Sequence, residues 1–206
     1  MAHGASGITV HLRGDRRHVQ DSDVERLGSA IDGKVNLEMA TTDEMLGIAE
    51  RLRPEQVTLV PERPEEVTTE GGLDVIGQTE ALTAAADRLS TAGIEVSVFV
   101  DPVEAQIARL AELALPGVTG FEINTDRYTH PGAAASELEA IVAAAALGEQ
   151  VGLRVYAGHG LTVANVAPVA TIPQVEELNI GHSIVSRAVL IGMAAAVEEM
   201  LAAMSV

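Results

Sequence analysis

The chain has 206 residues, of which 47% are hydrophobic and 21% are charged, and this is the composition of one globular domain covering residues 1–206. Thirty acidic side chains against 13 lysines and arginines give a formal charge of −17, which repels nucleic acid and anionic membranes, so any phosphate must be bound by a local cluster of cations. The absence of cysteine excludes disulfides and thiolate metal sites, and the apolar runs are too short for a signal peptide or a membrane span, so we expect a soluble, cytoplasmic protein.

Short β-branched runs alternate along the chain with segments of helical periodicity. Seven candidate strands lie at residues 7–12, 34–39, 56–61, 95–100, 120–124, 154–158 and 176–181. The apolar positions predict helices at residues 22–31, 43–52, 77–93, 104–114 and 136–150, and a last helix after residue 181. Repeats of strand, helix and strand pair the strands in parallel through right-handed crossovers, so the sequence predicts an α/β fold.

Both an open doubly wound sheet and a closed (β/α) barrel fit this alternation. The polar residues favour the barrel, because His11, Glu38, Glu122 and His159 lie at or just past the ends of different strands. An open sheet would gather them near one switch point, and no Gly-x-Gly-x-x-Gly follows a strand. We therefore predict a TIM-type (β/α) barrel with seven of its eight strands present. Residues 1–6 resemble the tail of a helix and a loop, so we expect the missing strand to precede them. The alternatives are that association with another chain closes the gap, or that a degenerate relative has lost the strand.

The first strand runs into a cluster of cations, in the stretch GITVHLRGDRRH at residues 7–18. Guanidinium groups bind phosphate through paired hydrogen bonds, so Arg13, together with His18, is a candidate clamp for a phosphate monoester. Arg16 and Arg17 are equally well explained as surface side chains that a neighbouring carboxylate neutralises.

Three later strand ends carry titratable side chains. Glu38 lies in the apolar strand end NLEMA, where burial would raise its pKa towards the range useful for proton transfer. The alternative is an ion pair with a cation from a neighbouring helix, and Glu122 in GFEIN allows the same two interpretations. His159 lies between two glycines in YAGHGLT, where the backbone can approach a ligand closely and an imidazole can exchange protons near neutral pH.

Two further segments are candidates for ligand binding. Gly181 and His182 open the last helix, where barrel enzymes often hold a phosphate on free backbone N–H groups, although Gly181 would also serve simply to end a strand. The polar segment PERPEEVTTEGGLDV at residues 61–75 carries Thr68 and a pair of glycines. It is long for a loop after a strand, and it is either a lid over the site or a surface excursion.

A metal site is the remaining possibility at the strand ends. His11, Glu38 and His159 would supply two imidazoles and one carboxylate. Neither His-x-His nor His-x-x-x-His spacing supports such a site, so we expect no metal.

Five of these stretches together resemble the pyridoxine 5'-phosphate synthase family of vitamin B6 biosynthesis. They are GITVHLRGDRRH, NLEMA, LVPERPEEVTTEGGLDV, AGHGLT and ELNIGHSIV, in the same order over nearly the whole chain. The resemblance implies a (β/α)8 barrel that condenses 1-deoxy-D-xylulose 5-phosphate with 3-amino-2-oxopropyl phosphate, releasing phosphate and water and forming the pyridine ring. It implies no cofactor, and a homo-oligomer. Two phosphorylated substrates would explain the cations behind the first strand.

The resemblance also implies roles for the candidate residues. His11 and Glu38 match the family's proton acceptors, His159 matches its proton donor, and Glu122 matches the carboxylate that stabilises a charged intermediate. Six residues would hold the substrates: Arg13, His18 and Thr68 the deoxyxylulose phosphate, and Gly160, Gly181 and His182 the aminoketone phosphate.

Two departures from the family leave other functions open. The family's first strand, which carries an asparagine and a histidine and is followed by an arginine, is missing, and the segment after Glu122 reads NTDRY where the family often has a histidine and a glycine. One alternative is a noncatalytic binder of phosphate ligands that has lost the first strand. Another is a different phosphate-handling barrel, such as an isomerase or aldolase. A Schiff-base aldolase needs a lysine at a strand end, and Lys34 begins its strand instead.

Overall fold

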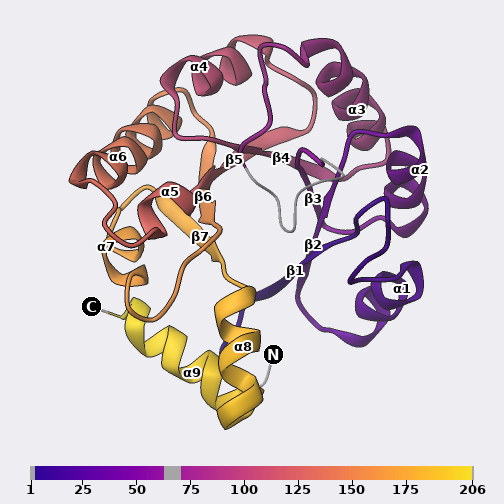
Figure 1. The fold of residues 1–206 in the computed structure, drawn as a ribbon. Coiled ribbons are helices and arrows are strands. Elements are labelled where there is room, and N and C mark those ends of the chain that lie inside the picture. The colour runs from indigo at the N-terminus through magenta and orange to yellow at the C-terminus, as the bar shows by residue number, and fades with distance from the viewer. Residues whose placement is uncertain (1–2, 63–70, 206) are drawn as a thin grey trace.

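The computed structural model describes residues 3–62 and 71–205, and the strands in these residues form one curled parallel sheet (Figure 1). The sheet has seven strands in the order of the chain: β1 Gly7–His11, β2 Lys34–Met39, β3 Gln56–Leu59, β4 Glu95–Val100, β5 Val118–Asn124, β6 Arg154–Gly158 and β7 Val175–Asn179. Every neighbouring pair is parallel. The carboxyl ends of all these strands therefore meet at one rim, which is the arrangement that the TIM-type prediction requires.

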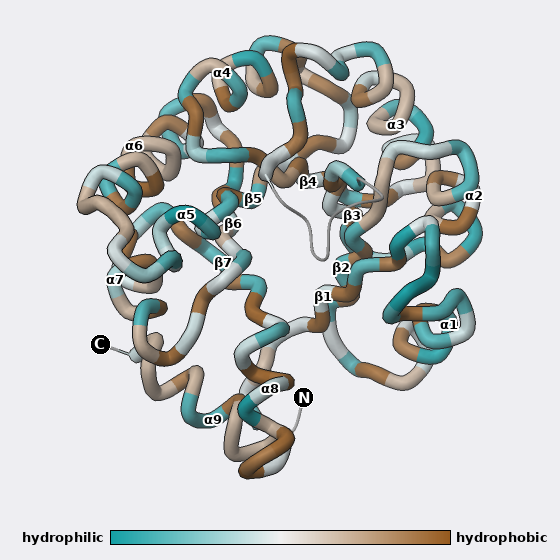
Figure 2. Tube along the Cα trace, in the orientation of Figure 1, coloured by the Kyte–Doolittle hydropathy of each residue, from teal (hydrophilic) through white to brown (hydrophobic). Residues whose placement is uncertain are grey.

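Helices cover the outside of the sheet (Figure 1). They are α1 Asp21–Ala30, α2 Asp43–Leu52, α3 Thr79–Thr91, α4 Glu104–Leu113, α5 Asp126–Thr129, α6 Ala135–Gln150, α7 Val166–Ala170, α8 His182–Ile191 and α9 Met193–Met204. Hydrophilic and hydrophobic stretches alternate along the outer helices (Figure 2), as expected when each helix buries only one face. The middle strands are the most deeply buried, and Leu37, Val57 and Val98 have no exposed surface, whereas every residue of β1 and β7 is at least partly exposed.

The α/β fold and all seven predicted strands are confirmed. The short helices α5 and α7 were not predicted, and the remaining differences lie at the ends of elements and in the last helix. The third strand stops at Leu59 instead of residue 61, because Pro61 has no N–H to continue the ladder. The single helix predicted after residue 181 is two helices, α8 and α9. Gly192 separates them with φ of +87°, a conformation that ends a right-handed helix.

The two strands at the ends of the order, β1 and β7, are linked by side chains across the inside of the curled sheet. Thr9 Oγ1 donates a 2.7 Å hydrogen bond to Asn179 Oδ1. Lys34 Nζ, at the start of β2, lies 2.8 Å from Glu177 Oε2 on β7. The curvature that closes a barrel is therefore present in this seven-stranded sheet, and it brings residues from opposite ends of the chain to the same interior.

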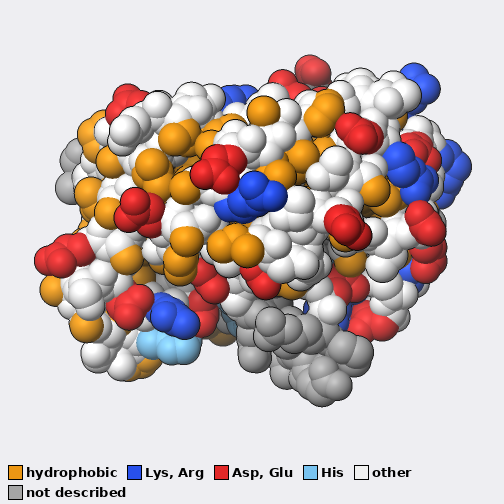
Figure 3. Space-filling model, turned by 90° about the horizontal axis from the view of Figure 1, so that it is seen from above, with side chains coloured by type: hydrophobic (Ala, Val, Ile, Leu, Met, Phe, Trp, Pro, Cys, Tyr) orange, Lys and Arg blue, Asp and Glu red, His pale blue; other side chains and the backbone are white. Residues whose placement is uncertain are grey.

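Acidic and basic side chains are interspersed on the surface. On the face that Figure 3 shows, basic side chains lie among acidic ones rather than in a separate patch. Arg88, for example, contacts both Asp43 and Glu50. Such exposed pairs contribute little to the free energy of unfolding.

Candidate active site

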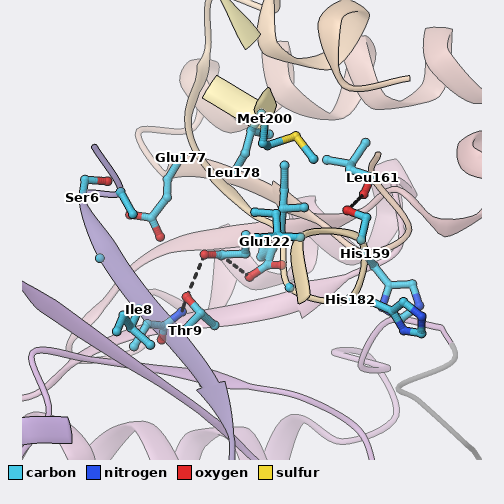
Figure 4. A pocket seen from close by; sticks show the side chains of 18 of the residues that line it. Ser6, Ile8, Thr9, Glu122, His159, Leu161, Glu177, Leu178, His182 and Met200 are labelled. Atoms are coloured by element: carbon cyan, nitrogen blue, oxygen red, sulfur yellow. Dashed lines mark hydrogen bonds between the residues drawn. The ribbon is translucent and has the colours of Figure 1, made fainter. Parts of the chain in front are cut away.

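A cavity of about 690 Å³ lies inside the curled sheet. Six of the ten predicted site residues line it: Glu38, Glu122, His159, Gly160, Gly181 and His182. Figure 4 shows Glu122 within it and His159 and His182 on one side of it. The cavity continues past Thr9 and Leu178 to Met200 of α9. The sequence predicts that residues from different strand ends meet in one place, and these six residues do so.

The other four predicted residues have different surroundings. His11 faces Glu38, with His11 Nδ1 3.9 Å from Glu38 Oε2. The Arg13 side chain is buried, and its Nε lies 3.5 Å from Asp15 Oδ1. His18 is exposed and does not line the cavity. Thr68, and with it most of the predicted lid, falls outside the described residues.

His11 lies between two carboxyl groups. It pairs in register with Glu38 on β2, so the two side chains leave neighbouring strands at the same level. On the other side of the ring, His11 Nε2 lies 3.0 Å from Glu62 Oε1, and Glu62 Oε2 accepts a 3.0 Å hydrogen bond from the backbone N–H of Gly14. Glu62 was not among the predicted site residues, because the sequence indicated only that it begins a long polar loop.

The two carboxyl groups predicted to be catalytic both have a raised pKa. Burial raises the pKa of Glu38, and the nearby His11 offsets part of this effect. Burial, followed by the negative charge of Glu38, raises the pKa of Glu122 well above the ordinary value. Within the described residues, the titratable side chain that faces Glu38 is therefore His11 on an adjacent strand, and not the helix cation that the sequence left open. Carboxyl groups shifted in this direction can hold or release a proton nearer neutral pH.

A chain of hydrogen bonds fixes Glu122. Asn179 Nδ2 donates to Glu122 Oε2 at 2.8 Å, and the Oδ1 atom of the same amide accepts from Thr9. Dashed lines in Figure 4 mark these two bonds, which connect Thr9 to Glu122 through the amide of Asn179. Asn179 and Thr9 are functional candidates that sequence reasoning missed, since their only signal is a polar side chain on an inward-facing strand position.

Gly158 gives the Glu122 carboxylate its space. A Cβ atom at Gly158 would lie 2.2 Å from Glu122 Oε1 and 2.9 Å from the backbone oxygen of Asn179. No side chain can occupy that point while both neighbours keep their positions. The glycine at the end of β6 is thus a requirement of the site.

His159 follows β6 with a left-handed backbone. Its φ is +81°, which is uncommon for a residue other than glycine and persists only where the surroundings hold it. Its Nε2 atom lies 3.6 Å from Asp126 Oδ1, and its ring centroid lies 6.3 Å from that of Phe99. Gly160, the next residue, also has a positive φ, and a Cβ there would lie 2.2 Å from Thr129 Oγ1.

The arginines behind β1 separate into two kinds. Arg16 donates to Asp21 at 3.2 Å and to Glu44 at 2.6 Å, and Arg17 donates from Nε to Asp15 at 2.7 Å. The hydrogen bond from Arg17 lowers the pKa of Asp15 to about 2. These contacts fit the interpretation of Arg16 and Arg17 as neutralised surface residues, and Arg13 stays the candidate for phosphate.

The described residues offer neither a metal site nor a membrane span. No group of three or more histidine, aspartate or glutamate side chains there is arranged to hold a metal ion. Among the helices of residues 3–62 and 71–205, none has the length and apolar character needed to cross a membrane.

Solved structures share the architecture at low sequence identity. The Amycolatopsis orientalis BexX/CysO complex matches with a TM-score of 0.65 and 18% identity, over 98% of this chain and 79% of that one. Phosphoribosyl anthranilate isomerase from Thermus thermophilus matches with a TM-score of 0.61 and 17% identity, over 99% and 90%. At such identities the likeness establishes the TIM-type fold alone.

Sequence comparison is more specific. The model of the family described as "Pyridoxal phosphate biosynthesis protein PdxJ" matches residues 1–206. The pyridoxine 5'-phosphate synthase of Trichlorobacter lovleyi is 53% identical over 201 residues, 96% of this chain and 83% of the relative. That of a Synechococcus species is 54% identical over 204 residues, 98% and 84%. The chain belongs to the PdxJ family of pyridoxal phosphate biosynthesis proteins.

Proposed function

We propose that the chain is a pyridoxine 5'-phosphate synthase, which joins 1-deoxy-D-xylulose 5-phosphate to 3-amino-2-oxopropyl phosphate and releases phosphate and water. Relatives with this name are 53% and 54% identical over nearly the whole chain, which supports an enzyme rather than the noncatalytic alternative. One structural observation carries the proposal. Glu38, Glu122 and His159 come from three separate strand ends and line one cavity.

The chemistry requires several proton transfers within one site. The amine of one substrate attacks the carbonyl of the other, water is lost to form a Schiff base, and ring closure follows with further loss of water and of phosphate. Each step removes a proton from one atom and delivers a proton to another. His11 and Glu38 accept protons in this scheme, His159 donates one, and Glu122 stabilises a charged intermediate. The raised pKa values of Glu38 and Glu122 support these assignments.

Two groups of residues would hold the phosphates. Arg13, His18 and Thr68 bind the deoxyxylulose phosphate in this proposal, and Gly160, Gly181 and His182 bind the aminoketone phosphate. Gly181 is the N-cap of the ten-residue helix α8 and lines the cavity. The first N–H groups of a helix have no partner within it, and together with the helix dipole they favour an anion.

We further propose that the enzyme works as a homo-oligomer in the cytoplasm and binds neither nucleic acid nor membrane. The net charge of −17 supports the proposal that the chain binds neither nucleic acid nor anionic membranes. Val189 and Leu190, near the end of α8, are 83% and 77% exposed, and apolar side chains in such positions favour contact between copies. Sedimentation of a monomer across micromolar concentrations would contradict the oligomer.

The proposed reaction predicts an absolute requirement for two substrates. The purified chain is expected to form pyridoxine 5'-phosphate and inorganic phosphate in equal amounts when both phosphorylated substrates are present. Omitting either one serves as the control and is expected to abolish both products. Cleavage or rearrangement of a single phosphorylated substrate, in the absence of the amine, would instead favour an aldolase or an isomerase.

A further inference from the structure

The Glu62 carboxylate makes two hydrogen bonds that connect separate parts of the site. It follows β3, whereas His11 ends β1 and Gly14 lies in the turn behind it. One oxygen contacts the His11 ring at 3.0 Å and the other accepts the Gly14 N–H at 3.0 Å. Both side chains are largely enclosed, with 17% of His11 and 16% of Glu62 exposed. Glu62 thus faces the ring nitrogen opposite to the one that faces Glu38.

These contacts determine which nitrogen of His11 carries hydrogen. Burial works against ionisation of Glu62, but the hydrogen bonds from His11 and Gly14 outweigh it and keep its pKa below the ordinary value. An ionised carboxylate can only accept hydrogen bonds, so the 3.0 Å contact requires hydrogen on His11 Nε2. In the neutral ring the lone pair then belongs to Nδ1, which lies 3.9 Å from the Glu38 carboxyl.

We propose that Glu62 is a positioning residue for His11, holding the ring in the Nε2-protonated tautomer so that the basic Nδ1 atom is directed towards Glu38. The inference rests on the proposed function of His11 as a proton acceptor. Because the carboxylate also holds Gly14, it fixes the turn that carries the ring as well as the ring itself. A carboxylate is the side chain for this role, since it offers one acceptor oxygen to each of the two donors.

The Glu62→Gln variant separates this role from simple packing. Its amide has the same shape but one oxygen, so either His11 or Gly14 loses its acceptor. We expect 15N NMR of labelled histidine to show Nε2–H as the main tautomer of His11 in the wild type and a substantial Nδ1–H population in Glu62→Gln. We expect kcat to fall about 10- to 100-fold, with KM changed less than about threefold, because positioning supplies part of the proton-transfer contribution. Glu62→Ala, which removes both acceptors, is a second variant with the same expected result.

Glu55→Gln is the matched control. Glu55 stands just before β3 as Glu62 stands just after it, and it also accepts a backbone hydrogen bond, from Val35 at 3.0 Å. In the Glu55→Gln variant, the tautomer of His11 and the value of kcat are expected to equal those of the wild type. An unchanged His11 tautomer in both Glu62 variants would overturn the inference. The NMR measurement needs no turnover, so a tautomer shift in a protein that makes no pyridoxine 5'-phosphate would sustain the positioning role and refute the proposed function instead.

Discussion

A Glu38→Gln variant is expected to lose about 10²- to 10⁴-fold in kcat for pyridoxine 5'-phosphate formation, which is the usual contribution of one general acid–base group. Glutamine keeps the size of the side chain but cannot accept a proton. Glu38 lines the cavity and faces His11, so the change removes a proton acceptor without opening space. The measurement is a steady-state assay with both substrates at saturation.

The same variant is expected to be more stable than the wild type at neutral pH. The pKa of Glu38 is raised in the folded protein above its ordinary value of 4.5. Such a group favours the folded state most at low pH, and this contribution is lost as pH rises from the unfolded pKa through the raised folded pKa. Urea unfolding should therefore show that Glu38→Gln gains stability relative to the wild type between pH 4 and pH 7. Full activity in this variant, or a stability difference that does not change with pH, would contradict the assignment.

A Gly158→Ala variant is expected to damage both the site and the sheet. The added methyl group would lie 2.2 Å from Glu122 Oε1 on β5 and 2.9 Å from the backbone oxygen of Asn179 on β7, and both strands pair with β6. Glu122 must move, and its 2.8 Å hydrogen bond from Asn179 is then lost or distorted. We expect the free energy of unfolding to fall by about 1–3 kcal/mol, as for other overpacked interiors. We expect activity to fall at least about 100-fold.

Gly47→Ala is the control for this prediction. Gly47 lies in helix α2 and is exposed, and apart from its chain neighbours and the backbone of its own helix no atom lies within 4 Å of the position that a Cβ would take. Alanine there should stabilise the protein by about 0.5–1 kcal/mol and leave activity unchanged. Wild-type activity in Gly158→Ala would show that Glu122 does not need its observed position.

The features that follow from local sequence were predictable. The strands are short segments that contain β-branched or other apolar residues, and residues such as Leu37 and Val57 are buried as their apolar runs indicate. The positions of Glu38, Glu122 and His159 at or near strand ends were also predictable, because parallel strands bring their carboxyl ends to one rim. The topology alone was therefore enough to predict that these groups meet, without knowledge of the detailed packing.

The partners of these groups were not predictable, because they come from distant parts of the chain. Thr9 and Asn179 are 170 residues apart, and they meet only because the sheet curls until β1 approaches β7. Glu62 reaches His11 from 51 residues away through a turn whose course no periodicity encodes. His18 is exposed in the turn behind β1, which includes Arg16 with a positive φ of 52°. Such turns depend on tertiary contacts more than on the residue types within them.

Carboxyl 13C NMR titration of Glu122, in the wild type and in Glu38→Gln, tests directly whether the acid–base groups share one site. With Glu38 and Glu122 in one cavity, the wild-type midpoint lies above the ordinary value of 4.5. The midpoint then falls when Glu38 is replaced, because a neighbouring negative charge has been removed. A Glu122 midpoint near 4.5 that is the same in both proteins would contradict the shared site.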